Sequence, residues 1–146
     1  MQSKLIFHKQ ETLYSCVPAC LRMVLSAFEV DISEVELRQQ CDCTPFGTEA
    51  LKAVDAVRNL GFSRTAKCTL TINELYFLLE VNVYPIVFVN LLPIDGVKVA
   101  HAMIVVAIAQ GIVTVYDPLQ GERNLPHSTF DTAWAMMHNL AILVQN

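Results

Sequence analysis

The 146-residue chain is poor in charged side chains and contains no long apolar run. Charged residues make up 16% of it, against roughly 25% in an average soluble protein. The main apolar runs, residues 84–94 and 102–109, are much shorter than the ~20 residues that a membrane-spanning helix needs. Residues 1–12 contain no apolar stretch of the kind found in a secretion signal. We therefore expect a cytoplasmic protein that has a large core or an apolar surface for a protein partner.

The chain also lacks a cluster of basic residues. Its net charge is −4, and residues 71–146 hold two lysines or arginines against six acidic residues. This distribution argues against binding to nucleic acid or to an anionic membrane surface. The five cysteines are an odd number without a secretion signal, so we interpret them as reduced thiols and not as a disulfide framework.

Apolar residues recur at helical spacing in the first part of the chain. The spacing predicts a helix over about residues 16–28. Ser33 and Glu36 form the capping-box pattern of a second helix. Thr48 is expected to cap a third helix, which Gly61 would end at its C-terminus.

After residue 62 the pattern changes to strands. A turn at Gln110-Gly111 predicts that two of these strands form a hairpin. Short helices are expected over about 71–80, where Thr71 and Glu74 form a capping box, and over about 129–137. Helices followed by strands predict an α+β fold with a helical lobe packed on an antiparallel sheet, in a single domain over residues 1–146. The expected strands lie within residues 63–70, 85–91, 101–109, 112–118 and 141–145.

Cys16 lies where the first helix is expected to begin. A cysteine at a helix N-terminus lies near unpaired N–H groups and the positive end of the helix dipole, and both favour the thiolate that attacks carbonyl carbons. The alternative is a buried structural thiol, because free cysteine is among the residues most often buried. Cys20 follows one turn later on the apolar face and is interpreted as a core residue.

A nucleophilic thiol needs a base, and His101 is the candidate among four histidines. It opens one strand of the predicted hairpin and Asp117 ends the other, so both lie at the same end. Simple pairing leaves them about three residues out of register, so a β-bulge or a bend at Pro118 must close the gap. Asp117 would then orient the imidazole and stabilise its protonated form. The other histidines lie in polar or charged segments: His8, His127 and His138.

Gln10 stands six residues before Cys16. Thiol attack on a peptide carbonyl produces a tetrahedral oxyanion that needs preorganised hydrogen-bond donors. The side-chain amide of Gln10 and the backbone N–H of Cys16 would supply them if residues 11–15 fold back on the helix start. Each candidate residue alone has an ordinary structural explanation, so the prediction of a catalytic site depends on their combination.

The order and setting of these four residues resemble the papain-like bacteriocin-processing peptidases. These are the double-glycine leader peptidases, often found as the N-terminal domain of peptide-exporting ABC transporters. The resemblance implies a cysteine endopeptidase with Cys16 as nucleophile and Gln10 as oxyanion donor. His101 would be the base and Asp117 its orienting partner. It covers nearly the whole chain and includes CVPACLRMVLSAF, FGTEALKAVDAVRNLGF, YPIVFVN, HAMIVVAI and VYDPLQG.

The resemblance also implies a substrate, a peptide precursor whose leader is cut off after a pair of small residues. We expect no cofactor and no metal. Two positions differ from the family's usual pattern: Ser15 replaces a common acidic residue, and Val17 replaces a common glycine beside the thiol. No membrane or ATPase segment follows residue 146, so we expect a free-standing member or a fragment of a longer one, with an apolar patch that meets a transporter or other protein partner.

Two other functions stay open at this point. Cys16–Cys20 and Cys41–Cys43 would form a zinc or redox site, although the second spacing is too tight for the usual Cys-x2–4-Cys pattern. A non-catalytic relative that only docks a leader peptide would share the same fold. A missing catalytic residue would indicate such a relative, and all four candidates are present.

Overall fold

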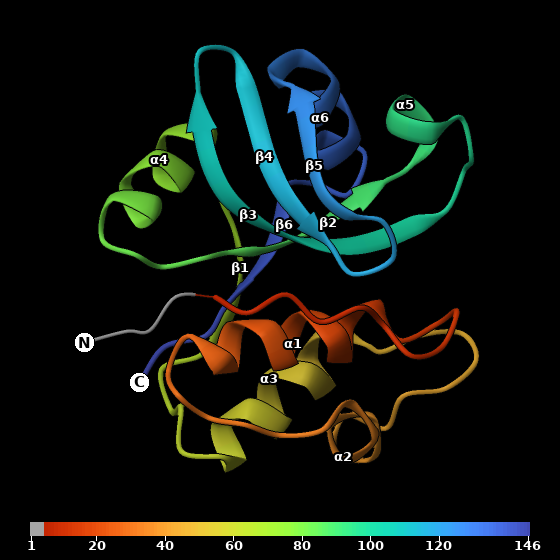
Figure 1. Cartoon of the computed structure of the whole chain (residues 1–146), viewed down its shortest axis with the longest axis vertical. Coiled ribbons are helices and arrows are strands. Elements are labelled where there is room, and N and C mark those ends of the chain that lie inside the picture. Colours follow the sequence, from red (N-terminus) through yellow and green to blue (C-terminus); the bar gives the residue numbers. More distant parts are fainter. Residues whose placement is uncertain (1–4) are drawn as a thin grey trace.

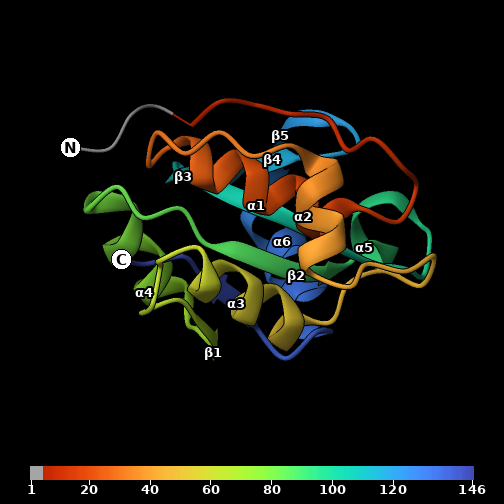
Figure 2. The same ribbon diagram turned by 90° about the horizontal axis from the view of Figure 1, so that it is seen from below.

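A computed structural model describes residues 5–146; the first four residues of the domain expected over 1–146 lie outside the described part. The described chain forms three layers. Figure 1 shows helices α1 (Cys16–Ser26), α2 (Glu34–Gln40) and α3 (Ala50–Asn59) on one side of the sheet and α4 (Ile72–Glu80) and α6 (His127–Ala135) on the other. In Figure 2, seen from below, α1, α2 and α3 lie in front of the sheet. This arrangement confirms the predicted α+β class, with helices packed on an antiparallel sheet.

The first layer consists of α1 (Cys16–Ser26), α2 (Glu34–Gln40) and α3 (Ala50–Asn59). Their buried faces share one apolar core with one face of the sheet, to which Ile86 and Ile104 belong. Helix α1 packs on both α2 and the sheet. The residue that begins α1 is therefore held between the two layers.

Two of the helix caps predicted from the sequence are present in the structure, and a third is not. Ser33 caps α2 by accepting a hydrogen bond from the Glu36 N–H at 3.2 Å. Gly61, with a φ of +106°, follows the end of α3 in the left-handed conformation expected there. The prediction that Thr48 caps α3 is wrong. The cap is Glu49, because the backbone is still extended at that residue (φ −68°, ψ 137°).

The sheet of the described residues is antiparallel, with the strand order β1-β6-β2-β3-β4-β5. Five of its strands coincide with the predicted runs. Strand β5 was not predicted, because its sequence GERNLP is polar and contains a proline. Such a sequence is tolerated where the strand lies at the edge and pairs on one side. The strands are β1 (Ala66–Thr69), β2 (Ile86–Asn90), β3 (Ala100–Ala109), β4 (Ile112–Asp117), β5 (Gly121–Pro126) and β6 (Leu140–Leu143).

The other face of the sheet is covered by α4 (Ile72–Glu80) and α6 (His127–Ala135), which share a second apolar core with it. The capping box predicted for the fourth helix is present between Thr71 and Glu74. Helix α6 starts two residues earlier than predicted, and the single turn α5 (Leu92–Asp95) was not predicted. Within residues 5–146, no helix is both long enough and apolar enough to cross a membrane.

A β-bulge in the β3–β4 hairpin decides which side of the sheet Asp117 faces. The pairing of the two strands shifts by one residue between Val105 and Ala107. Because neighbouring residues of a strand point to opposite faces, one extra residue changes the face of every residue beyond it. Extending the shifted pairing by one residue places Asp117 opposite Met103, on the side that His101 shares by alternation. The prediction of a bulge or bend in this hairpin is thus confirmed.

Candidate active site

Cys16 is the first residue of α1 and lines a pocket between this helix and the sheet. Pro18 occupies the first turn of the helix, where the absence of an N–H leaves no hydrogen bond unmade. The pocket has a volume of about 230 Å³ and receives residues from α1, β2, β3 and the loop before α3. It is lined by Cys16, Val17, Phe46, Gly47, Thr48, Phe88, Ala100, His101, Ala102 and Met137.

His101 and Asp117 are joined by a hydrogen bond of 2.7 Å between Nε2 and Oδ1. Only 7% of His101 and 1% of Asp117 is exposed. The same Oδ1 accepts the backbone N–H of Leu119 at 2.9 Å, which holds the carboxylate against the turn after β4. Since Asp117 engages Nε2, the other ring nitrogen, Nδ1, is the one left for Cys16.

The second oxygen of Asp117 is held by Arg123, a residue of β5. Arg123 Nη1 donates to Asp117 Oδ2 at 3.2 Å. The same guanidinium forms two further bonds, of 3.0 and 2.7 Å, with the carboxylate of Asp95 at the end of α5. Burial alone would raise the pKa of Asp117, but bonding to His101, the Leu119 N–H and Arg123 holds that pKa below its usual value. The carboxylate is therefore ionised at neutral pH.

The imidazole of His101 lies between two groups that favour its charged form. Burial alone would lower the pKa of His101, but hydrogen bonding and charge at Asp117 and Cys16 outweigh this and raise the pKa to about 9. His101 is therefore protonated at neutral pH. A protonated imidazole beside a sulfur atom is ready to stabilise a thiolate and later to donate a proton.

Residues 10–15 fold back on the start of α1, as an oxyanion donor at Gln10 requires. Gln10 is 7% exposed, and its Nε2 donates to the carbonyl oxygen of Thr12 at 2.7 Å. One of the two Nε2 hydrogens is used in this bond, so the second stays free for a substrate oxygen. Gln10 Oε1 is buried and has no hydrogen-bond partner among the described residues.

The two unusual neighbours of Cys16 have clear structural roles. Ser15 is fully buried, and its Oγ accepts the Thr12 N–H at 3.1 Å and donates to the Thr12 carbonyl at 3.3 Å. Ser15 thus closes the turn that carries the chain from Gln10 to the helix. Val17 is 3% exposed, packs in the helical core and lines the pocket. A branched side chain therefore does lie beside the thiol.

Two of the remaining cysteines are core residues. Cys20 and Cys41 are fully buried between the helices and the sheet. Burial, with a smaller contribution from neighbouring charges, raises the pKa of Cys20 far above its usual value and that of Cys41 to about 12. Both are neutral thiols and poor metal ligands. Within residues 5–146, no group of three or more His, Cys, Asp or Glu side chains is arranged to hold a metal ion.

The other three histidines lie elsewhere. His127 pairs with Asp131 at 3.2 Å at the start of α6, and His138 lies in the turn that follows this helix. His8 belongs to the segment before α1. In the described part of the chain, His101 is the histidine that lines the pocket of the candidate nucleophile.

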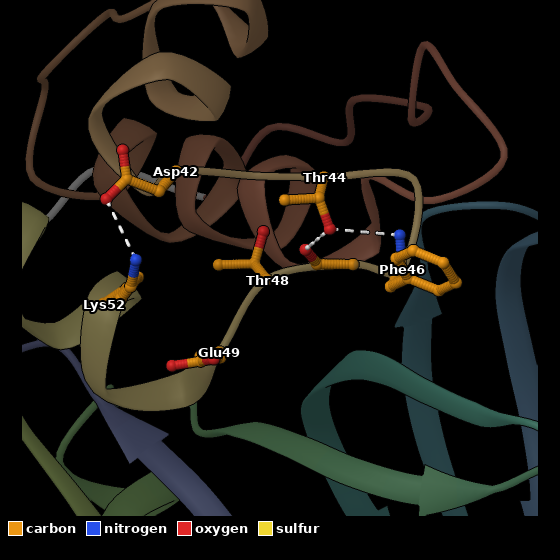
Figure 3. A pocket seen from close by; sticks show the side chains of 7 residues that line it. Asp42, Thr44, Phe46, Thr48, Glu49 and Lys52 are labelled. Atoms are coloured by element: carbon orange, nitrogen blue, oxygen red, sulfur yellow. Dashed lines mark hydrogen bonds and ion pairs between the residues drawn. The ribbon is translucent and has the colours of Figure 1, made fainter.

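A second, polar pocket of about 320 Å³ adjoins the first (Figure 3). An ion pair of 3.2 Å between Asp42 and Lys52 lies at one side of it. The two pockets share Phe46, Gly47 and Thr48, none of which was predicted as a site residue. Phe46 is fully exposed at the rim. The hydroxyl oxygen of Thr48 is buried and has no hydrogen-bond partner among the described residues.

Comparison with known proteins decides the family. Residues 4–146 match the sequence model of the peptidase C39 family. The chain belongs to this family. The resemblance to the double-glycine leader peptidases is thereby confirmed, and with it a cysteine peptidase fold. No curated protein sequence matches this C39 chain.

Solved structures that resemble the C39 chain share its papain-like fold at low sequence identity. The peptidase domain of Streptococcus ComA, a bifunctional ABC transporter of a quorum-sensing pathway, is 24% identical with a TM-score of 0.75, over 95% of this chain and 97% of that one. A putative C39-like peptidase from Bacillus anthracis is 15% identical with a TM-score of 0.81, over 98% and 95%. A double-glycine-motif protease from an AMS/PCAT transporter, in complex with a leader peptide, is 19% identical with a TM-score of 0.75, over 97% and 91%.

Proposed function

We propose that this C39 chain is a cysteine endopeptidase whose nucleophile is Cys16. The observation that carries the proposal is the position of His101, which lines the pocket of Cys16 while its Nε2 bonds to the buried Asp117 at 2.7 Å. A thiol, an imidazole and a carboxylate in this order form the arrangement that activates a nucleophile for acyl transfer. Gln10 completes the set as the oxyanion donor.

In the first half of the reaction, the Cys16 thiolate attacks the carbonyl carbon of the scissile peptide bond. A C–S bond forms, and the carbonyl electron pair moves onto oxygen, where the Gln10 Nε2 and the Cys16 N–H stabilise it. His101, protonated because its pKa is about 9, then gives its Nδ1 proton to the leaving amine. The C–N bond breaks, the C-terminal product leaves, and a thioester on Cys16 remains.

In the second half, water replaces the thiolate on the acyl carbon. The now neutral His101 takes a proton from water, and the resulting hydroxide attacks the thioester. The C–S bond breaks, the N-terminal product leaves as a carboxylic acid, and the thiolate–imidazolium pair returns. Asp117 keeps the ring oriented throughout and balances its positive charge. No cofactor enters this scheme.

The substrate in this proposal is a precursor peptide whose leader ends in two small residues. Val17 beside Cys16 narrows the pocket, which suits a Gly-Gly or Gly-Ala junction. A slot that only excludes bulk discriminates by ~1–3 kcal/mol per methylene, so the leader must supply binding energy elsewhere. Exposed apolar side chains on and after α4, namely Tyr76, Phe77 and Val81, fit the apolar face of a leader helix. A transporter or another protein is the corresponding partner.

The test compares cleavage of a leader-length peptide with a Gly-Gly junction, a short peptide with the same junction, and a long peptide whose junction glycine is leucine. We expect the first to be cut much faster than the other two, and Cys16→Ala to abolish all cleavage. Gln10→Ala should keep the fold and lower turnover by ~10²-fold or more. Equal rates for long and short peptides would contradict leader specificity. Leader binding without cleavage by the unmodified protein would instead identify a non-catalytic relative.

A further inference from the structure

We propose that Glu34 is a positioning residue for Gln10 and acts through the backbone N–H of Glu11. The inference rests on the proposed function, since Gln10 needs positioning only if it donates to an oxyanion. Glu34 is the first residue of α2, yet its side chain is turned into the molecule and is 1% exposed. Carboxylates are almost never buried to this extent unless they are paired. The partners of Glu34 therefore indicate its role.

The first partner of Glu34 lies in the peptide bond that follows Gln10. Glu34 Oε1 accepts the backbone N–H of Glu11 at 2.9 Å. On the other side of Gln10, its own N–H donates to the Pro118 carbonyl at 2.7 Å. The peptide planes before and after the Gln10 Cα are thus both held, one by the turn after β4 and the other by α2. The direction in which the Gln10 side chain leaves the backbone is fixed by these two bonds together.

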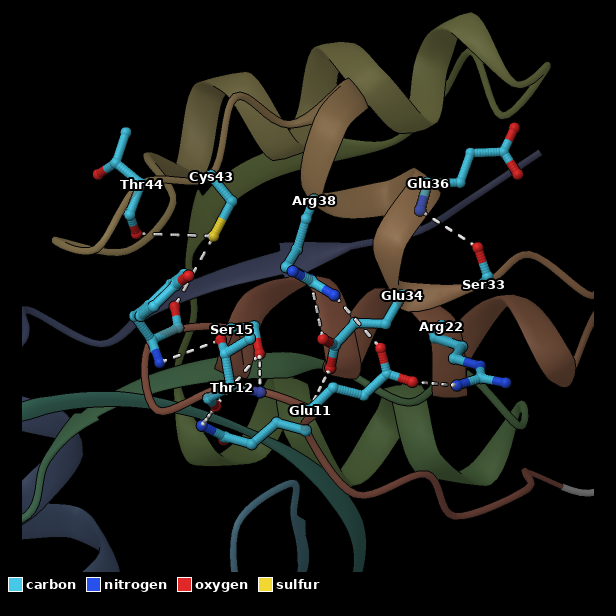
Figure 4. A network of polar contacts seen from close by, with 12 residues as sticks. Glu11, Thr12, Ser15, Arg22, Ser33, Glu34, Glu36, Arg38, Cys43 and Thr44 are labelled. Atoms are coloured by element: carbon cyan, nitrogen blue, oxygen red, sulfur yellow. Dashed lines mark hydrogen bonds and ion pairs between the residues drawn. The ribbon is translucent and has the colours of Figure 1, made fainter.

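Arg38 pairs with the buried carboxylate of Glu34, and both Arg38 and Arg22 pair with the neighbouring Glu11 (Figure 4). Arg38 Nε lies 3.1 Å from Glu34 Oε2, out of line for a hydrogen bond but close enough for an ion pair. Arg38 Nη2 donates to Glu11 Oε1 at 3.3 Å, and Arg22 Nη1 lies 3.7 Å from Glu11 Oε2. Arg22 belongs to α1 and Arg38 to α2, so the network joins the nucleophile helix to the segment that carries Gln10.

Stability alone is a weak reason for this arrangement. Replacing a buried ion pair by apolar side chains is often neutral or stabilising, because the pair must be taken out of water. What a charged acceptor adds is a short, directional hydrogen bond that holds one backbone position. Oxyanion donors need such preorganisation, because they act only if they are already oriented when charge develops on the substrate. The buried carboxylate of Glu34 is explained by this requirement.

The inference is tested with Glu34→Ala and Glu34→Gln, each alone and combined with Gln10→Ala. The substrate is the p-nitrophenyl ester of acetyl-Gly-Gly. Transfer of its acyl group to Cys16 passes through the same kind of oxyanion and needs no leader. A second readout is the rate at which iodoacetamide alkylates Cys16, a displacement at carbon that forms no oxyanion. Glu36→Gln is the matched control, since Glu36 is exposed on the same helix and carries the same charge.

Glu34→Ala, which removes the acceptor, should lower the acylation rate by ~10–100-fold, and Glu34→Gln, which keeps a neutral acceptor, by ~3–10-fold. Alkylation of Cys16 should stay at the unmodified rate in both. Combined with Gln10→Ala, neither should slow acylation further, because Glu34 acts through Gln10. Glu36→Gln should behave as the unmodified protein. If Glu34→Ala fails to fold, the double-mutant cycle of Glu34→Gln and Gln10→Ala decides whether Glu34 acts through Gln10.

Three results would overturn the positioning role. The first is a full acylation rate in both Glu34 variants, and the second is a loss of acylation rate that multiplies with the loss caused by Gln10→Ala. The third is alkylation of Cys16 that slows in parallel with acylation in the Glu34 variants. The last would mean that Glu34 supports the helix and the triad instead of the oxyanion donor. Failure of the proposed function looks different. In that case Gln10→Ala itself would acylate at the unmodified rate, or Cys16→Ala would stay active.

Discussion

The backbone N–H of Gln10 and the carbonyl oxygen of Pro118 are joined by a hydrogen bond of 2.7 Å. Pro118 directly follows Asp117, so the segment with the proposed oxyanion donor is attached to the turn with the proposed orienting carboxylate. The positions of Gln10 and Asp117 therefore depend on each other and not only on the elements that carry them. A change at Pro118 that moves its carbonyl would disturb both the oxyanion donor and the triad.

Cys16 should be the thiol most reactive toward iodoacetamide at neutral pH. Cys20 and Cys41 are shielded by complete burial, and burial raises the pKa of Cys68 as well. Cys43 is the informative control, because it is partly exposed but lies outside the pocket of His101. Mass mapping after limited labelling should find Cys16 modified far ahead of the other four. First modification at Cys43 or Cys68 would contradict the assignment of the nucleophile.

The titration of His101 should depend on Asp117. The pKa of His101 is about 9, well above its ordinary 6.5, and the bond to Asp117 is one of its main causes. Asp117→Asn keeps an oxygen near Nε2 but removes the charge, so the pKa of His101 should move down toward 6.5. NMR titration of the imidazole carbons measures this shift directly. An unchanged titration midpoint in Asp117→Asn would show that Asp117 does not stabilise the protonated ring.

The same pKa predicts how stability depends on pH. A histidine whose pKa is 6.5 unfolded and about 9 folded contributes stability that is fully present below pH 6.5 and is lost as the pH rises through 9. The free energy of unfolding should therefore fall across this window, and fall less in Asp117→Asn. Denaturant titrations below, within and above the window measure it. His127→Gln, a change at a surface histidine, should leave the fall unchanged, and an equal fall in Asp117→Asn would contradict the explanation.

Phe46 should contribute to substrate binding without contributing to stability. It is fully exposed and lines both pockets, so a bound peptide would cover its ring. For Phe46→Ala we expect KM for a leader-length Gly-Gly peptide to rise by roughly 10-fold at unchanged kcat, the effect of losing one covered aromatic ring. Leu13→Ala is the control, since Leu13 is 90% exposed and lines neither pocket. An unchanged KM in Phe46→Ala would place the peptide elsewhere.

The parts of the site that could be predicted are those encoded by local patterns. Pro18 and the apolar spacing after Cys16 indicate a helix start, and the Gln110-Gly111 turn brings His101 and Asp117 to one end of a hairpin. Even the need for a bulge followed from counting residues to this turn. Each of these inferences uses residues within a single element or between neighbouring elements of the chain.

The parts that could not be predicted depend on contacts between distant segments. Glu34 reads as an ordinary acidic residue in the first turn of a helix, and its bond to the Glu11 N–H spans 23 positions. Arg123 lies on an edge strand too polar to be recognised, although it is one of only two basic residues after residue 70. Thr48 precedes an apolar stripe, where a threonine usually caps a helix, but α3 begins at Ala50 and its cap is Glu49.

The bulge between Val105 and Ala107 makes the chemistry of the site depend on how many residues the hairpin contains. If Val106 paired regularly and no bulge formed, Asp117 would lie opposite Ile104 and face the side of the sheet away from His101, with every proposed catalytic side chain still present. A relative with the same four residues at the same spacing but a regular hairpin would therefore have no triad. In relatives, the presence of the bulge at this spacing between the histidine and the aspartate, 16 positions in this chain, is as informative as the identity of either residue.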